Sequence, residues 1–158
     1  MRTSDFDEFV LGSSTRLLRA AYLLTGDRHS AEDLVQDVLS RMYVAWPRID
    51  DPQAYARRAL VHAATNRWRR AARRPEVALE TKHDLASPGL DAERVDLLAA
   101  LRQLPAGQRA VIVLRFLDDV SVDDTARALG CSAGTVKSQT ARALPRLRAL
   151  LAEPCERP

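Results

Sequence analysis

Residues 121–142, SVDDTARALGCSAGTVKSQTAR, carry the spacing of a helix-turn-helix. Ala126 stands where two helices would cross closely, Gly130 follows where the turn needs a permissive backbone, and Val136 would plug the space between the helices. The half of the segment after the turn contains basic side chains and no acidic residue, which suits a helix laid against phosphates. The segment therefore predicts a DNA-binding element.

The composition predicts a helical chain. Hydrophobic residues make up 46% of the 158 residues and aromatic residues only 5%, whereas sheet proteins favour aromatic and β-branched residues. A chain of this length can bury one medium core or two small ones. The positions of Pro and Gly must therefore indicate whether it forms one domain or two. The net charge of +3 is modest and favours localised basic surfaces over a general coating of DNA.

The charges are distributed unevenly along the chain. Residues 1–51 hold nine acidic residues against six arginines, whereas residues 52–75 hold seven arginines and no acidic residue. An acidic segment followed by a basic helix predicts two different partners.

Apolar periodicity predicts three helices in the N-terminal half. The first covers residues 4–25, the second is capped by Asp27 or Ser30 and ends at Pro47, and the third covers residues 52–73. We expect these three helices to share one core.

The periodicity fades after residue 73, where Pro, Ser and Gly gather, and this stretch predicts a linker. Beyond it a short helix stops before Pro105, another runs from Pro105 to Leu117, and the helix-turn-helix completes a four-helix domain. We therefore expect an all-α fold of two small helical domains joined by a flexible linker. The expected bounds are residues 1–73 and 92–152 for the domains, 74–91 for the linker and 153–158 for a disordered tail.

The predicted third helix interleaves its arginines with Tyr55, His62, Asn66 and Trp68. Arginines can hold a phosphate backbone while aromatic and amide side chains receive unstacked bases, as in single-strand binding. The alternative is a solvated basic face, with Tyr55 and Trp68 as ordinary core residues, and core packing is the simpler interpretation of those two. The absence of any acid over so long a stretch favours a nucleic-acid surface for the arginines.

The predicted second helix, AEDLVQDVLSRMYVAW, places Glu32, Asp33, Gln36 and Asp37 on one side. Clustered carboxylates suit acid–base catalysis or a metal, but they also suit a docking face for a protein, which we favour here. Because the helix dipole favours acids in the first turns, simple solvation explains part of the pattern.

No group of residues in the sequence predicts catalysis, a cofactor or a metal. The histidines are scattered, and the two cysteines give neither a disulfide framework nor metal-ligand spacing, so Cys131 more simply fills an apolar slot after the turn. The sequence also shows no nucleophile with its base and no glycine-rich phosphate loop, so we expect no enzyme. Without an apolar signal segment or an apolar run of about 18 residues, we expect a cytoplasmic protein with no membrane insertion.

Three segments in order resemble a bacterial RNA polymerase sigma factor of the extracytoplasmic-function (ECF) type, within the sigma-70 family. They are AEDLVQDVL, DPQAYARRALVHAATNRWRR and LRQLPAGQRAVIVLRFLDDVSVDDTARALGCSAGTVKSQTARAL. The chain is similar in particular to the compact actinobacterial branch labelled SigE-like, and the resemblance covers nearly all of it apart from the linker and tail. It implies a subunit that binds core polymerase and directs promoter-specific, DNA-templated transcription initiation.

The resemblance also implies roles for individual residues. The first domain would be a sigma region 2 helical bundle, and its acidic helix would dock on the clamp of the largest polymerase subunit through Asp33, Leu34, Gln36 and Asp37. Its basic helix would capture the −10 element through Arg58, His62, Asn66, Arg67, Trp68, Arg69 and Arg70. The second domain would be a sigma region 4 helix-turn-helix that contacts the polymerase flap and reads the −35 element through Ser132, Thr135, Lys137, Ser138 and Arg142. An anti-sigma factor is a further partner that the family suggests as a hypothesis.

Three residues depart from the family pattern. His62 stands where relatives usually have Asn, which leaves the preferred −10 base open, and Thr140 replaces a commoner apolar residue. Pro145 falls inside a usually continuous recognition helix and should bend or end it near residues 141–144. A free-standing helix-turn-helix regulator is the rival hypothesis, but it leaves the arginine-rich helix unexplained.

Overall fold

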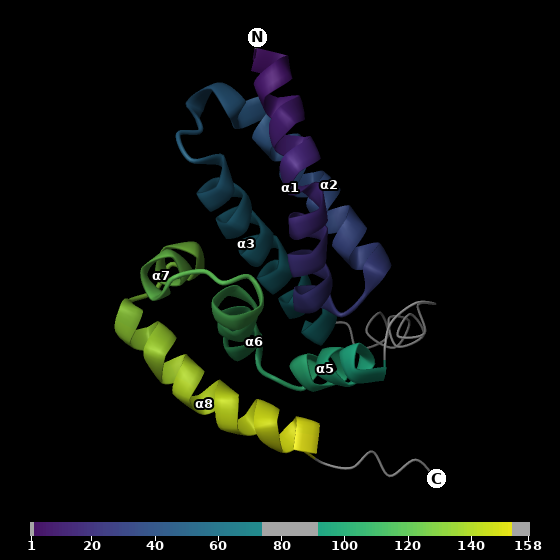
Figure 1. Cartoon of the computed structure of the whole chain (residues 1–158), viewed down its shortest axis with the longest axis vertical. Helices are drawn as coiled ribbons and strands as arrows, with labels where there is room; N and C mark the ends of the chain where they lie inside the picture. The colour runs from purple at the N-terminus through teal and green to yellow at the C-terminus, as the bar shows by residue number, and fades with distance from the viewer. Residues whose placement is uncertain (1, 74–91, 153–158) are drawn as a thin grey trace.

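The computed structural model describes residues 2–73 and 92–152, which form helices and connecting turns without a strand (Figure 1). The predicted all-α fold is therefore confirmed. The predicted linker and tail lie outside the described residues.

The N-terminal half is a three-helix unit. It consists of α1 (Arg2–Thr25), α2 (Arg28–Ala45), the short 3-10 helix η1 (Trp46–Arg48) and α3 (Pro52–Arg73). Helices α1 and α2 pack as a hairpin, and α3 lies against both. Gly26 turns the chain between the first two helices with φ of 73°, and Asp27 caps α2 by accepting hydrogen bonds from the backbone N–H groups of His29 and Ser30.

The C-terminal half consists of α5 (Ala92–Arg102), α6 (Ala106–Ile112), η3 (Val113–Leu117), α7 (Val122–Leu129) and α8 (Ala133–Ala152). The single helix predicted from Pro105 to Leu117 is continuous, but its last turn, η3, widens to π-helical pitch. The wider turn closes with a 2.8 Å hydrogen bond from the Asp118 N–H to the Val113 carbonyl, and Asp119 follows with a left-handed φ of 53°.

The helix-turn-helix formed by α7 and α8 has the packing that its sequence predicts. Ala126 and Val136 are buried together, Val136 completely, and Cys131 is partly buried against them. Gly130 adopts the left-handed conformation with φ of 68°, and the Cys131 N–H closes the turn on the Ala126 carbonyl at 3.0 Å. The predicted motif and the apolar slot for Cys131 are confirmed.

Helix α8 runs through Pro145 as far as Ala152, the last residue that the structure describes. The helix was expected to bend or end near residues 141–144, and the expectation that it ends there is wrong. A proline inside a helix costs about 3 kcal/mol, but Ala143 and Leu147 on either side of it are buried in the core, and their burial offsets that cost.

The two halves share one continuous apolar core, which the sequence did not predict. Leu24 of α1, Leu60 of α3 and Leu114 of η3 are each at most 6% exposed and belong to the same cluster. The turn at Gly26 is part of this contact, because a Cβ added there would lie 2.6 Å from the Nε of Arg102 in α5. Helix α7 packs on α3, while α8 lies on the far side of α6 and α7 (Figure 1).

Candidate nucleic-acid interface

Helix α3 presents a basic face to solvent. Arg58, His62, Asn66, Arg69 and Arg70 are all exposed. Trp68 lies within the helix, but its side chain is outside the described part of the structure. Helix α3 contains no acidic residue. Its exposed face carries cationic side chains together with an amide and an imidazole, which can hydrogen-bond to bases.

Arg67 differs from its neighbours because it is engaged within the protein. Its guanidinium donates to the Ser30 carbonyl at 2.8 Å and to the Asp33 carboxylate at 3.4 Å. Both partners belong to α2, so Arg67 fixes the orientation of the basic helix against the acidic one. This internal role reduces what Arg67 has available for a phosphate.

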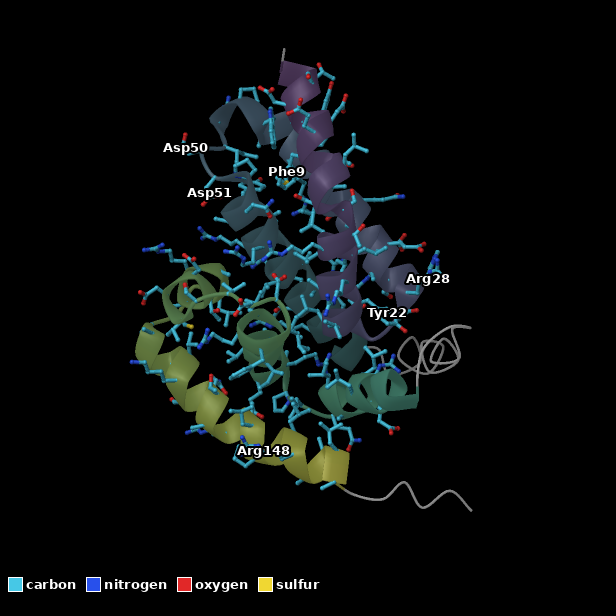
Figure 2. All side chains as sticks on the ribbon, in the orientation of Figure 1. Phe9, Tyr22, Arg28, Asp50, Asp51 and Arg148 are labelled. Carbon is cyan, nitrogen blue, oxygen red and sulfur yellow. The ribbon has the colours of Figure 1, made fainter. Side chains whose placement is uncertain are left out.

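A cleft of about 330 Å³ lies at the N-terminal end of α3. Tyr55, Arg57 and Arg58 line it from α3, and Asp50 and Asp51 line it from the preceding turn, where Figure 2 labels both carboxylates. Tyr55 is 36% exposed, so its interpretation as a core residue is wrong. The ring is free to contact a planar group in the cleft.

The acidic side of α2 is also exposed. Asp33, Gln36 and Asp37 point to solvent on one face, and Asp37 pairs with Arg41 at 3.2 Å. Leu34, by contrast, is only 5% exposed and packs in the core. Its side chain packs on the inner side of α2 and leaves almost no surface for a partner. Leu34 is therefore a core residue and not a direct docking contact.

The predicted duplex-reading residues lie on the outer side of α8. The exposed side chains are Ser132, Thr135, Lys137, Ser138 and Arg142. Ser132 also caps the helix, since its Oγ accepts the Thr135 N–H at 3.1 Å and lies 3.0 Å from the Thr135 hydroxyl. These two hydroxyls therefore hold each other in place at the helix N-terminus.

Arg109 of α6 is a structural residue that sequence reasoning missed. Its side chain is 2% exposed and donates to four backbone carbonyls, those of Leu101, Arg102, Leu104 and Leu24, at 2.7–3.1 Å. These acceptors are at the C-terminal ends of α5 and α1, where the helix dipoles are negative. Burial, and secondarily repulsion from Arg102, lowers the pKa of Arg109 to about 10, so the group is charged at neutral pH. The one signal in the sequence is an arginine directly before the apolar run AVIVL.

The described residues contain no group of three or more His, Cys, Asp or Glu side chains that could hold a metal ion. Within the same residues, no helix is both long enough and apolar enough to cross a membrane.

A basic helix lies beside a helix-turn-helix, and each has an exposed polar face; a helix-turn-helix of this kind is typical of DNA-binding proteins. Two family models match these two parts: "Sigma-70 region 2" matches residues 12–74, and "Sigma-70, region 4" matches residues 94–147. The chain is 41% identical to the RNA polymerase sigma-E factor of Streptomyces coelicolor over 152 residues, which cover 91% of this chain and 84% of the relative.

Two solved structures have a similar fold. The first is the sigma factor RpoE of Bartonella quintana in complex with the anti-sigma factor NepR, with a TM-score of 0.74 and 26% identity over 93% of this chain and 96% of that one. The second is CnrH in complex with the cytosolic domain of CnrY, with a TM-score of 0.70 and 27% identity over 94% and 88% of the two chains.

The chain belongs to the ECF group of the sigma-70 family of RNA polymerase sigma factors. It is a sigma factor that directs transcription initiation, and the resemblance found in its sequence is confirmed. A sigma factor is a non-catalytic polymerase subunit, so the expectation that the chain is no enzyme is confirmed as well.

Proposed function

We propose that this sigma factor grips a promoter at two places, with α3 on the −10 element and α8 on the −35 element. The observation that carries the proposal is the acid-free face of α3, where arginines alternate with exposed His62 and Asn66. Arginines neutralise phosphates in any sequence, whereas an amide and an imidazole can hydrogen-bond to the edge of an unstacked base. A face of this composition suits a strand that has already been separated from its partner.

On α3 we assign phosphate contacts and base contacts according to which side chains are exposed. Arg58, Arg69 and Arg70 are free to contact phosphates, and His62 and Asn66 lie near the bases. We keep Trp68 as a stacking candidate on its position in the sequence and Arg67 as a weaker phosphate contact, because it already binds α2.

On α8 the exposed residues Thr135, Lys137, Ser138 and Arg142 would contact the −35 duplex in the major groove. Ser132 would position the start of the helix and present its N-terminus to a phosphate. We keep residues 1–73 and 92–152 as the proposed bounds of the region 2 and region 4 domains.

Core polymerase would bind the acidic face of α2. Asp33, Gln36 and Asp37 would contact a basic surface on the clamp of the largest subunit, and the C-terminal unit would contact the flap. Since the two matched structures are described as complexes with an anti-sigma factor and with the cytosolic domain of a second protein, we also propose an inhibitory protein partner of the anti-sigma class. With these partners, we propose a cytoplasmic location.

Run-off transcription with purified core polymerase and a random promoter library tests the proposal. We expect initiation only when the protein is added, and sequencing of the active templates should show two conserved elements. In the double variant Arg69→Ala, Arg70→Ala initiation should fall while core binding is retained. The rival hypothesis of a free-standing regulator would be favoured if the protein alone bound a duplex sequence-specifically and no template supported initiation.

A further inference from the structure

The docking face of α2, formed by Asp33, Gln36 and Asp37, is tied to α3 at one of its carboxylates. Asp37 pairs at 3.2 Å with an arginine four residues further along its own helix. Asp33 instead accepts from Arg67 of α3, through Oδ2 at 3.4 Å. Exposed pairs within one helix are weak, whereas a donor from a second helix fixes the carboxylate of Asp33 against the rest of the N-terminal unit.

Arg67 is itself anchored, so it can hold Asp33 in one orientation. Its Nη1 donates to the Ser30 carbonyl at 2.8 Å, which is the shorter of its two contacts with α2. Ser30 in turn donates its backbone N–H, at 3.1 Å, and its hydroxyl to the buried carboxylate of Asp27, the cap of α2. A chain of hydrogen bonds therefore leads from a buried helix cap to an exposed carboxylate on the docking face.

Both ion-pair contacts of Asp33 use the same oxygen. The Arg67 guanidinium lies 3.4 Å from Oδ2 and the His29 imidazole lies 4.0 Å from it, while the Asp33 side chain is still 51% exposed. Each oxygen of a carboxylate can accept hydrogen bonds of its own. Oδ1 therefore remains for a cationic donor on a partner, while Oδ2 keeps the side chain in place.

We propose that Arg67 is a positioning residue of the docking face, which holds Asp33 by Oδ2 and leaves Oδ1 for core polymerase. This inference rests on the proposed docking of α2, and it gives Arg67 a role in assembly in place of a phosphate contact. A flexible side chain loses conformational entropy when a partner immobilises it. Because Arg67 fixes Asp33 beforehand, that cost is not added to the free energy of binding core polymerase.

The sign of the effect separates positioning from simple electrostatics. Arg67→Ala removes a positive charge beside the acidic face, so electrostatics alone would raise the affinity for a basic partner. Loss of positioning should instead lower the affinity for core polymerase by roughly 2- to 10-fold. Arg70→Ala is the matched control, because Arg70 is an exposed arginine of the same helix, and this variant should bind core polymerase at least as tightly as the native protein.

A double-mutant cycle tests whether Arg67 acts through Asp33. The affinity for purified core polymerase is measured by competition with fluorescein-labelled native protein. We expect Arg67→Ala to weaken binding in the native chain and in Asp37→Ala, but not in Asp33→Ala. Arg67→Lys should recover only part of the loss, because a compact ammonium lacks the fork that joins a carbonyl to a carboxylate. An equal loss in all three backgrounds, or no loss in the native chain, would overturn the proposal.

Strand binding by the assembled holoenzyme tests the alternative role of Arg67 on DNA. The probe is a fluorescein-labelled single strand from an active template of the promoter library, with core polymerase at a concentration that saturates every variant. Arg67→Ala should bind this strand as the native holoenzyme does, whereas Arg69→Ala, Arg70→Ala should bind it more weakly. Weaker strand binding by Arg67→Ala with unchanged core affinity would restore the phosphate contact and refute the positioning role. If neither Asp33→Ala nor Asp37→Ala weakened core binding, the proposed docking function would be refuted instead.

Discussion

Arg109→Met should strongly destabilise this protein, although the substituted side chain is apolar and of similar length. The native guanidinium donates to four carbonyls, and three of these hydrogen bonds are fully buried. Each stranded buried acceptor costs about 1–3 kcal/mol. Methionine relieves the cost of burying a charge, which offsets part of that loss.

We therefore expect the free energy of unfolding to fall by about 3–5 kcal/mol, a large share of the roughly 5–15 kcal/mol that stabilises a typical domain. Urea denaturation followed by circular dichroism measures this change, and thermal unfolding should shift downward by roughly 10 °C. Arg109→Lys should recover only part of the loss, because a single ammonium has three donors and lacks the planar fork of the guanidinium.

Arg148→Met is the matched control, since Arg148 is exposed on α8 (Figure 2) and its loss should change stability by no more than about 0.5 kcal/mol. If Arg109→Met were as stable as this control, the carbonyls at the ends of α5 and α1 would not depend on the guanidinium, and the explanation of its burial would be wrong.

Three further substitutions test the surfaces and the helix. Asp37→Arg should abolish binding to core polymerase in a pull-down while circular dichroism remains unchanged, because Asp37 is exposed and its ion pair is with Arg41 on the same helix. Retained assembly would remove the docking assignment. Lys137→Ala should weaken −35 duplex binding across sequences and lower the slope of log affinity against log salt by about 1 if it contacts one phosphate; an unchanged slope would exclude that contact. Pro145→Ala should raise the free energy of unfolding by about 1–2 kcal/mol, because alanine supplies a backbone N–H donor for the Ala141 carbonyl. This gain should exceed the loss that comes from a less rigid unfolded chain. A decrease in stability in urea denaturation would show that the proline fits the helix without strain.

Local sequence signals predicted the features that depend on neighbouring residues. The helix-turn-helix is fixed by a small residue, a left-handed glycine and an apolar plug within eleven positions, and all three behave as expected. The cap at Asp27 and the exposed faces of α2 and α8 follow from the same short-range periodicity. Such features need no knowledge of the rest of the fold.

The sequence failed where distant segments meet. Leu114 packs against the N-terminal helices, and Arg109 reaches the end of α1 across 85 positions of the chain. A periodic pattern identifies a buried side chain but does not identify its distant partner, so neither contact could be predicted. Pro145 was misjudged for a related reason: its local penalty is outweighed by the burial of neighbours such as Leu147, and burial depends on tertiary contacts.

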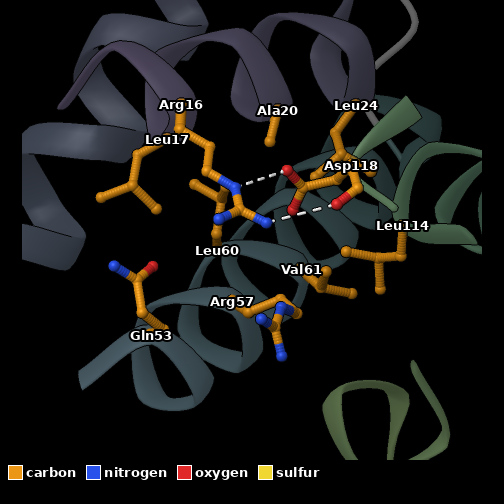
Figure 3. A pocket seen from close by; sticks show the side chains of 10 residues that line it. All are labelled: Arg16, Leu17, Ala20, Leu24, Gln53, Arg57, Leu60, Val61, Leu114 and Asp118. Carbon is orange, nitrogen blue, oxygen red and sulfur yellow. Dashed lines mark hydrogen bonds and ion pairs between the residues drawn. The ribbon is translucent and has the colours of Figure 1, made fainter. Parts of the chain in front are cut away.

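The contacts between the two units differ in strength. Arg16 of α1 donates through Nε to the Asp118 carboxylate at 2.9 Å (Figure 3). The Arg16–Asp118 pair is 53% and 16% exposed on its two sides, so it contributes at most about 1 kcal/mol and mainly sets the position of the units. Arg109 donates to the Leu24 carbonyl of the other unit and to three carbonyls of its own unit.

Most of the free energy that holds the two units together must therefore come from the apolar side chains where they meet. Leu24, Leu60 and Leu114 line a cavity of only about 20 Å³, and full exposure of each would cost about 1.5–3 kcal/mol. The apolar contact between the two units is therefore stronger than the ion pair that accompanies it.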